Sequence, residues 1–354
     1  MSSNIDTVII LAAGQGTRMK SATPKVLHEM CGRSLLGHSI AAARGLDPER
    51  IVAVVRHERD TVAAHALECD SDIIIADQDE IPGTGRAVWC GLQALPADAR
   101  GTCLVMAGDV PLLNTETLAR LADSRGDAAL SVLTTELEDA TGYGRIVRDE
   151  TGAVQAIVEH KDATEAQREI REINTSIYAF DIDFLRSALE NVDTNNSQGE
   201  MYLTDVLEAA YKQGAGTQAM VLDDNWLVEG CNDLVQLATL RKEMNRRVCE
   251  KLMRAGVSIH DPATTVIDVT VTAEPDAHIY PGAILRGNTH VGARALVGPG
   301  EYTDATIGAD ADVRHCVLRG ATVEAGERLV PYSVIASERS DDDERKAHES
   351  FTFV

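Results

Sequence analysis

The sequence contains no long apolar run and no secretory signal. No stretch approaches the roughly 18 consecutive apolar residues that a membrane-spanning helix needs, so we expect no membrane segment. The chain starts without a basic segment followed by an apolar run, the pattern of a signal peptide. We therefore expect a cytoplasmic protein.

Closely spaced cysteines are absent too. The seven cysteines are odd in number and irregular in spacing, and no CxxC motif occurs. This excludes a regular disulfide framework and the usual zinc-site spacing. Small buried thiols in a reducing compartment are the interpretation that remains.

Basic residues are scarce relative to acidic ones. Thirty-three Lys and Arg face 56 Asp and Glu, which gives a net charge of -23. Such a surface is a poor partner for nucleic acid or anionic lipid. An anionic ligand would need a local basic pocket, backbone amides or a metal ion. Chain length (354 residues) favours two domains.

The first part of the chain alternates short apolar runs with helical patterns, which predicts βαβ units and a Rossmann-like α/β fold with a mixed, mostly parallel sheet. Ligands of such sheets bind at the carboxyl ends of the strands. Strands are expected at 8–11, 51–55, 73–75 and 103–106, and helices at 35–45, 61–67, 85–95 and 115–122.

A long helical pattern over 233–255 ends at Gly256 and predicts a connecting helix. Apolar residues then recur at a spacing of six, which is typical of a β-helix of hexapeptide repeats. Ten such positions predict about three coils; a β-sandwich is the alternative. The positions are Ile279, Leu285, Val291, Val297, Ile307, Val313, Val317, Val323, Leu329 and Ile335.

Four segments are therefore expected. They are an α/β domain over 1–232, a linker helix over 233–255, a short β-helix over 256–337 and an acidic tail over 338–354.

The most informative segment is Leu11–Met19, directly after the first strand. Two glycines let the backbone approach a ligand, and successive amides can bind an anion. Arg18 and Lys25 add positive charge. The segment is neither a Walker A loop, since no GK[ST] follows, nor a dinucleotide fingerprint, since Met19 stands in place of the third glycine.

Together with Pro24–Leu27, this segment resembles the signature of sugar-nucleotide pyrophosphorylases. Further segments narrow the resemblance to the uridyltransferase part of the bifunctional N-acetylglucosamine-1-phosphate uridyltransferase/glucosamine-1-phosphate acetyltransferase family. These segments are Gly83–Gly85, Gly108–Leu112, Thr141–Ile146, Glu159–Ala163, Glu172–Thr175, Gln198–Asp205 and Glu229–Asn232. The resemblance runs from about residue 5 to 335 and implies that the β-helix is left-handed.

The resemblance also implies roles for individual residues. Arg18 and Lys25 would be catalytic and hold the phosphates, and Gln78 would recognise uracil. Asp109 and Asn232 would bind Mg²⁺. The other implied substrate contacts are Leu11, Ala12, Ala13, Gly14, Gly83, Thr84, Ala107 and Gly108 for the nucleotide, and Gly144, Glu159 and Asn174 for the sugar.

Simpler interpretations of these residues stay open. Asp109 or Asn232 could cap a helix, Glu159 could be a solvated charge, and Gln78 could lie in an ordinary surface loop. Two positions depart from the family: Arg86 stands where His is more usual, and Ala107 where some members have Tyr.

The implied reaction transfers uridylyl from UTP to N-acetylglucosamine-1-phosphate. The alternatives are transfer to another hexose-1-phosphate, a hexapeptide-repeat acetyltransferase and a non-catalytic regulator. No segment matches the family's acetyl-transfer residues, so we expect that activity to be absent. We also expect a homotrimer through the β-helix, with apolar flanks such as Ile279, Leu285 and Val291 exposed.

Overall fold

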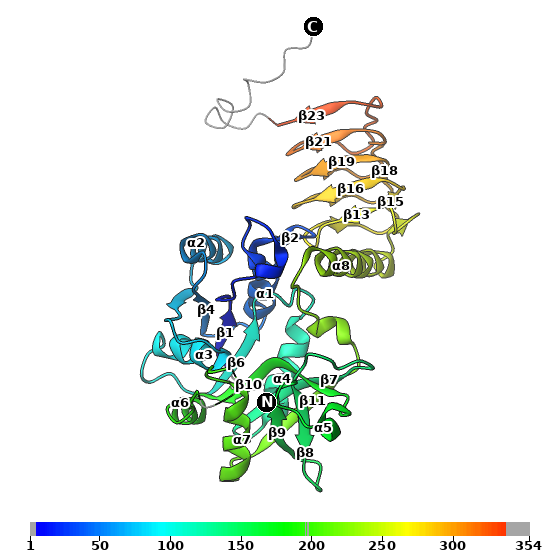
Figure 1. Ribbon diagram of the computed structural model, residues 1–354. Helices are drawn as coiled ribbons and strands as arrows, with labels where there is room; N and C mark the ends of the chain where they lie inside the picture. Colours follow the sequence, from blue (N-terminus) through cyan, green and yellow to red (C-terminus); the bar gives the residue numbers. More distant parts are fainter. Residues whose placement is uncertain (1–4, 195, 197, 338–354) are drawn as a thin grey trace. The chain divides into compact units, whose positions relative to one another are not determined.

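Strands and helices alternate through the first part of the chain and give way to short stacked strands in the second (Figure 1). This computed structural model describes residues 5–194, 196 and 198–337. It divides into two compact units at Leu240, a position inside helix α8 (Leu234–Arg254). The acidic tail expected at 338–354 lies outside the described residues.

The first unit is built on a nine-stranded mixed sheet with the order β11-β7-β10-β6-β1-β4-β5, to which β8 and β9 are added beside β10. The pairs β1–β4, β1–β6, β4–β5 and β7–β11 are parallel, whereas β10 runs antiparallel to its neighbours. The strands of this unit are β1 Ile5–Leu11, β2 Glu29–Met30, β3 Arg33–Ser34, β4 Arg50–Val55, β5 Ile74–Asp77, β6 Thr102–Ala107, β7 Leu130–Glu136, β8 Arg145–Arg148, β9 Val154–Val158, β10 Glu172–Asp181 and β11 Thr217–Leu222.

Helices follow the strands, as the sequence predicts. Asn114 caps α4 by accepting a hydrogen bond from the Thr117 amide, and Ser34 does the same for α1. The helices are α1 Leu35–Arg44, α2 Arg59–Cys69, α3 Thr84–Gln93, α4 Thr115–Arg125, α5 Glu165–Arg168, α6 Ile182–Leu189, α7 Thr204–Gln213 and α8, with 3-10 turns η1 Thr17–Met19, η2 Lys25–Leu27 and η3 Asn225–Val228. No helix among the described residues is long and apolar enough to cross a membrane.

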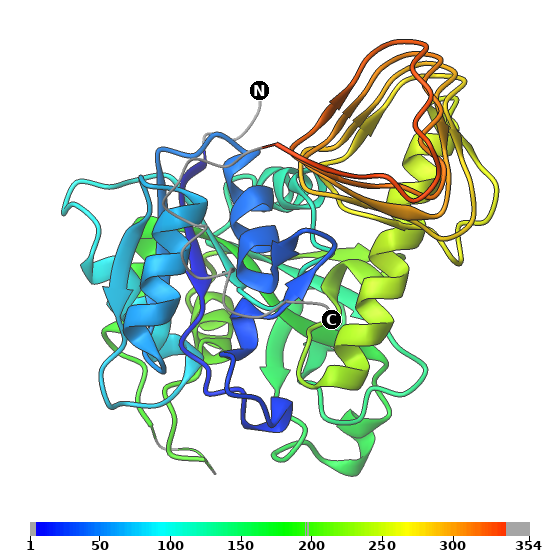
Figure 2. The ribbon, with the colours of Figure 1, turned by 90° about the horizontal axis from the view of Figure 1, so that it is seen from above.

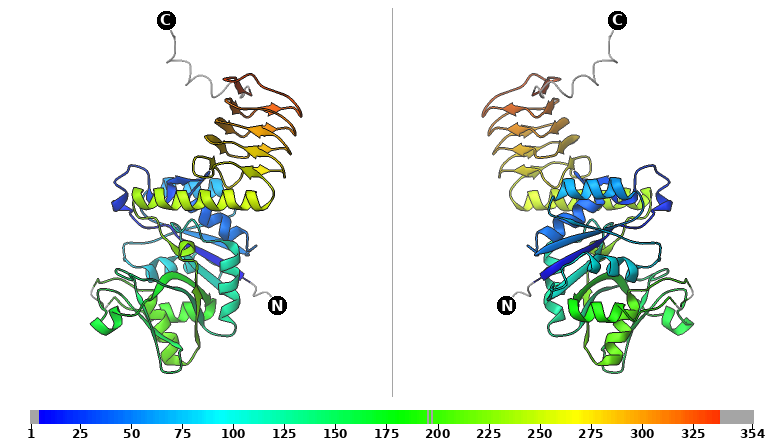
Figure 3. Two further views of the ribbon diagram at one scale, coloured as in Figure 1. Left: turned by 90° about the vertical axis from the view of Figure 1, so that its right-hand side faces the viewer. Right: turned by 90° about the vertical axis from the view of Figure 1, so that its left-hand side faces the viewer.

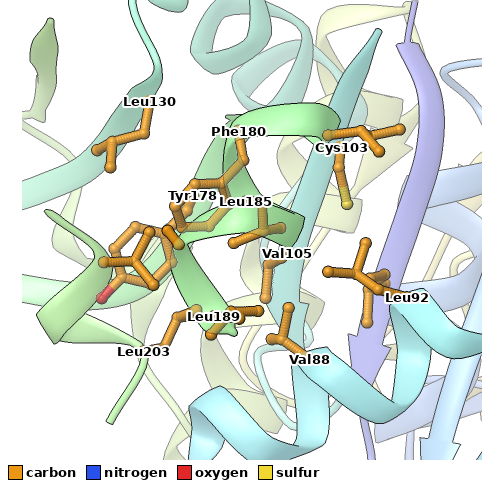
Figure 4. Close-up of a cluster of buried hydrophobic side chains, with 14 of the residues drawn as sticks. Val88, Leu92, Cys103, Val105, Leu130, Tyr178, Phe180, Leu185, Leu189 and Leu203 are labelled. Carbon is orange, nitrogen blue, oxygen red and sulfur yellow. The ribbon is translucent and has the colours of Figure 1, made fainter. Parts of the chain in front are cut away.

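Both faces of the large sheet are covered, which explains why its strands β1, β4 and β6 are mostly apolar. Successive side chains of a strand point to opposite faces. Ile9 accordingly packs in one cluster with α3, α6 and α7, and Ile10 in another with α1, α2 and α4. Figure 4 shows part of the first cluster, where Val88 and Leu92 of α3 meet Val105 of β6.

The second unit is a β-helix, as the sequence predicts. Its short strands form three parallel sheets, and its coils stack in layers with a triangular outline (Figures 2 and 3). The strands are β12 Ser258–Ile259, β13 Val266–Ile267, β14 Thr272–Ala273, β15 His278–Ile279, β16 Ala283–Arg286, β17 His290–Val291, β18 Leu296–Val297, β19 Gly300–Thr303, β20 Thr306–Ile307, β21 Val317–Arg319, β22 Thr322–Val323 and β23 Val334–Ala336.

The described chain makes more coils than the three expected. One sheet alone contains five stacked strands, β13-β16-β19-β21-β23. Its inward column runs through Ile267, Leu285, Tyr302 and Leu318, which are fully buried, and ends at Ile335, which is 37% exposed. The count failed because coil length varies: Ser258 pairs with His278, 20 residues on, whereas Thr306 pairs with Thr322, 16 residues on.

Three details of the repeat prediction need correction. Ile335, in the last described strand of its sheet, is exposed rather than buried. Val317 is only half-buried, and its neighbour Leu318 points into the coil instead. Ile279, Leu285 and Val291 are fully buried, so they do not form the exposed flanks that we expected for assembly.

Candidate active site

Four parallel strands of the first unit end at the same edge of the sheet, and the loops that follow them surround a cavity. The amide of Ala12 donates to Val54 O (2.8 Å), that of Gly108 to Leu11 O (2.9 Å) and that of Gln78 to Val55 O (2.9 Å). These bonds hold the loops after β1, β4, β5 and β6 together. The cavity has a volume of about 530 Å³.

Most of the residues implied to contact the nucleotide line this cavity. Its lining includes Leu11, Ala12, Ala13, Gly14, Lys25, Gln78, Gly83, Thr84, Ala107 and Asp109. A Cβ atom on Gly14 would meet nothing within 4 Å, so the backbone there is open to a ligand. At Gly16, by contrast, where φ is 63°, a Cβ would lie 2.5 Å from Lys25 Cβ. The glycine loop and the backbone end of Lys25 are therefore tightly packed.

Four predicted residues from distant parts of the chain form one charged cluster. Lys25 Nζ lies 2.5 Å from Asp109 Oδ2 and 3.5 Å from Asn232 Oδ1. Arg18 Nη2 donates to the same Asn232 oxygen at 2.8 Å. The side chains of Lys25 and Asp109 are only 15% and 14% exposed, so solvent screens their charges weakly.

The loop before α8 carries Asn232 to this cluster. The Cys231 amide donates to Asp109 O (3.0 Å), which ties this loop to the end of β6. The cap of α8 is Asp233, whose Oδ1 accepts from the amides of Val235 and Gln236. The helix-cap alternative for Asn232 is therefore wrong. The side-chain oxygen of Asn232 points to the positively charged groups of Arg18 and Lys25 instead.

Gln78 has a defined orientation in the cavity. Its Nε2 donates to Ile81 O (3.1 Å) and Gly83 O (3.3 Å). Both amide hydrogens are thus used within the loop, and Oε1 is left to accept a hydrogen bond from a ligand.

The three residues implied to contact the sugar also come together. The amide of Asn174 donates to Gly144 O at 2.9 Å, and a Cβ on Gly144 would lie 3.5 Å from Glu159 Oε1. Asn174 Oδ1 accepts from Tyr178 Oη and the Ser176 amide. Burial raises the pKa of Glu159, and the nearby carboxylates of Asp162, Asp205 and Glu200 add to this. None of the three lines the 530 Å³ cavity, but Ser176 does.

Sequence reasoning missed several residues of the cavity lining. Arg56 and His57 follow β4 directly, so the rule that ligands bind at the carboxyl ends of strands could have found them. Ser176 lies at an irregularity of β10, with φ at 62°, and Glu200 lies in a loop. Glu200 belongs to the family-matching segment Gln198–Asp205, but no role was assigned to it, and no sequence pattern pointed to Ser176.

The two departures from the family pattern differ in position. Arg86 pairs with Asp79 through its Nε (2.9 Å to Oδ2) and Nη2 and is not part of the cavity lining. Ala107 does line the cavity, at the end of β6.

A second cavity, of about 490 Å³, lies between α1 and α2 and contains none of the predicted site residues. Ser34 Oγ is 2.7 Å from His65 Nε2 there, but the same oxygen caps α1.

Comparison with known proteins identifies the family of this chain. Residues 8–172 match the MobA-like NTP transferase domain. The bifunctional protein GlmU of Paenarthrobacter aurescens is 52% identical over 334 residues, covering 93% of this chain and 67% of the relative. The GlmU proteins of Streptomyces coelicolor (51%; 93% of this chain, 69% of the relative) and Micrococcus luteus (49%; 94% and 70%) are similarly related.

The chain belongs to the GlmU family. It is a nucleotidyltransferase with the uridyltransferase role in the synthesis of UDP-N-acetylglucosamine. It acts on a nucleotide and a sugar phosphate, and nucleotidyltransferases of this family generally depend on a divalent metal. The roles of the individual site residues stay predictions.

Proposed function

We propose that the first unit transfers uridylyl from UTP to N-acetylglucosamine-1-phosphate and releases pyrophosphate. The observation that carries this proposal is the cluster of Arg18, Lys25, Asp109 and Asn232 beside a cavity lined by Gln78. Positive groups for the phosphates and an acceptor for the base thus lie in one site.

The reaction asks little covalent chemistry of the protein. An oxygen of the sugar phosphate, already an anion, attacks the α-phosphorus of UTP in line, and the bond to pyrophosphate breaks. Catalysis then consists of positioning and charge neutralisation. Arg18 and Lys25 neutralise the triphosphate, and the amides after Leu11 bind it along the glycine loop.

Asp109 and Asn232 fit a hard divalent cation. Their side-chain oxygens already face a common positive group, the ammonium of Lys25. One carboxylate and one amide oxygen, with water and phosphate oxygens, form a ligand set typical of Mg²⁺. When bound, Mg²⁺ would neutralise charge on the phosphate oxygens.

Gln78 accounts for the choice of base. The group of Gly144, Glu159 and Asn174 accounts for the choice of sugar. The free Oε1 of Gln78 can accept from N3–H of uracil, whereas N3 of cytosine carries no hydrogen. Glu159, as a carboxylate, accepts hydrogen bonds from sugar hydroxyls or the acetamido N–H.

Acetyl transfer is not part of the proposed function. The relatives are named bifunctional, and the chain spans 67% and 69% of the length of two of them.

We also propose a homotrimer through the β-helix. One outward column on its five-stranded sheet is mostly apolar: Val266, Ile284, Glu301, Val317 and Val334. The corresponding column on the neighbouring sheet is polar: Thr272, His290, Thr306 and Thr322. An apolar row of this kind is suited to packing against another copy.

A substrate panel tests the reaction. Wild-type protein is assayed with UTP or CTP, and with N-acetylglucosamine-1-phosphate or glucose-1-phosphate. We expect the first member of each pair to be preferred in kcat/KM. The Gln78→Ala variant should narrow the preference for UTP over CTP, because the base acceptor is lost. An unchanged ratio would mean that backbone groups alone recognise the base, and no uridine product at all would refute the proposal.

A further inference from the structure

We propose that Lys25 occupies the metal position of the resting site, so that the divalent metal and the nucleotide bind as a pair. The inference rests on the proposed function, which assigns the metal to Asp109 and Asn232. It adds a second task for Lys25: to hold this site in the absence of nucleotide and to release it when nucleotide arrives.

The contacts of Lys25 carry the inference. Its Nζ lies 2.5 Å from Asp109 Oδ2 and 3.5 Å from Asn232 Oδ1. These are the two oxygens that the metal requires. Both Lys25 and Asp109 are mostly buried, at 15% and 14% side-chain exposure. A divalent cation entering alone would therefore meet a carboxylate that is already neutralised and a positive charge within a few ångströms, in a weakly screened place.

The packing around Lys25 allows only its tip to move freely. A Cβ on Gly16 would lie 2.5 Å from Lys25 Cβ, so the start of the side chain is fixed against the glycine loop. The rest of the lysine side chain is long and flexible. The same loop offers its amides to the phosphates. The ammonium can thus turn from Asp109 to a bound triphosphate without backbone movement.

This exchange couples the two ligands. A triphosphate gives Lys25 a stronger anionic partner, which leaves Asp109 to the metal. Because coupling between two binding sites is reciprocal, the metal must raise the affinity for the nucleotide by the same factor. The inference predicts weak binding of metal alone and strong binding of the two together.

Mn²⁺ binding followed by electron paramagnetic resonance, without nucleotide, tests the inference. In Lys25→Gln the neutral amide no longer competes for Asp109, so we expect Mn²⁺ to bind at least about tenfold more tightly than in wild type. Binding of a non-hydrolysable UTP analogue, measured with and without saturating Mn²⁺, should show strong enhancement by metal in wild type and a smaller one in Lys25→Gln.

Two variants serve as controls. Lys212→Gln removes an exposed lysine of the same unit that pairs with Glu208, and should bind Mn²⁺ as wild type does. Asp109→Asn should weaken Mn²⁺ binding strongly. Thermal unfolding of each variant verifies that it is folded.

The possible outcomes separate the two proposals. If Mn²⁺ binding depends on Asp109 but is no tighter in Lys25→Gln than in wild type, the exchange is refuted and the metal site stands. If Asp109→Asn binds Mn²⁺ as wild type does, the metal assignment of the proposed function fails, and this inference with it.

Discussion

Glu159 shows how the surroundings of one residue set its chemistry. Burial, together with Asp162, Asp205 and Glu200, raises its pKa above the ordinary glutamate value. In the proposed site an ionised Glu159 would accept hydrogen bonds from the sugar, and a protonated one would do so less well. Since the pKa is raised, the ionised form is lost as pH falls, and this loss begins at a higher pH than for an exposed glutamate.

We therefore predict that KM for the sugar phosphate rises on acidification, starting above the usual titration range of a glutamate. The sugar phosphate titrates as well, so the pH profile of Glu159→Gln provides the reference. The variant should have a KM raised several-fold and a flatter profile. Identical pH profiles for the two proteins would mean that Glu159 does not contact the sugar.

At the scale of elements, the link between β5 and α3 depends on the backbone of Gly83. Its φ of 117° and ψ of 153° belong to a region that is essentially restricted to glycine. A Cβ there would also lie 2.3 Å from Met201 O. This glycine closes the loop that orients Gln78.

Gly83→Ala should destabilise the fold by roughly 1–3 kcal/mol and raise KM for the nucleotide, because the loop must shift. Gly152→Ala is the matched control: φ is again positive, at 87°, but nothing lies within 4 Å of the added methyl. Thermal unfolding and UTP kinetics measure both effects. If KM for the nucleotide is unchanged in Gly83→Ala, this loop does not contact the nucleotide.

The elements also show what the sequence could and could not predict. The central strands and the β-helix were predictable because apolar runs and six-residue spacing have a direct physical cause in burial. The number of coils was not predictable, because the coils differ in length, from 16 to 20 residues. A change of coil length shifts which residue points inward, so Leu318 is buried where Val317 was expected.

In the candidate site, Arg18 and Lys25 were singled out from their place in and near the glycine loop, and the family resemblance supplied Asp109 and Asn232. Ser176 reaches the cavity through the irregularity of β10, and Glu200 through the loop before α7.

At the scale of the whole molecule, the apolar outward column of the β-helix should control assembly. Light scattering is expected to give a mass near three times 38.1 kDa that does not depend on concentration. Val317→Lys should shift the mass toward that of a single chain, whereas Thr322→Lys, on the polar column, should not. A wild-type mass near 38.1 kDa would refute the trimer.

We expect uridylyl transfer to take place at the cluster around Asp109. The most direct measurement is the rate of UDP-N-acetylglucosamine formation from UTP and N-acetylglucosamine-1-phosphate, with Mg²⁺ or with EDTA, in wild type and Asp109→Ala. Asp70→Ala, which removes a carboxylate paired with Arg44 outside the site, is the control. We predict Mg²⁺-dependent turnover in wild type and Asp70→Ala, and a loss of about a hundredfold or more in Asp109→Ala. Asp109→Ala turnover within tenfold of wild type, or undiminished wild-type turnover in EDTA, would contradict the account.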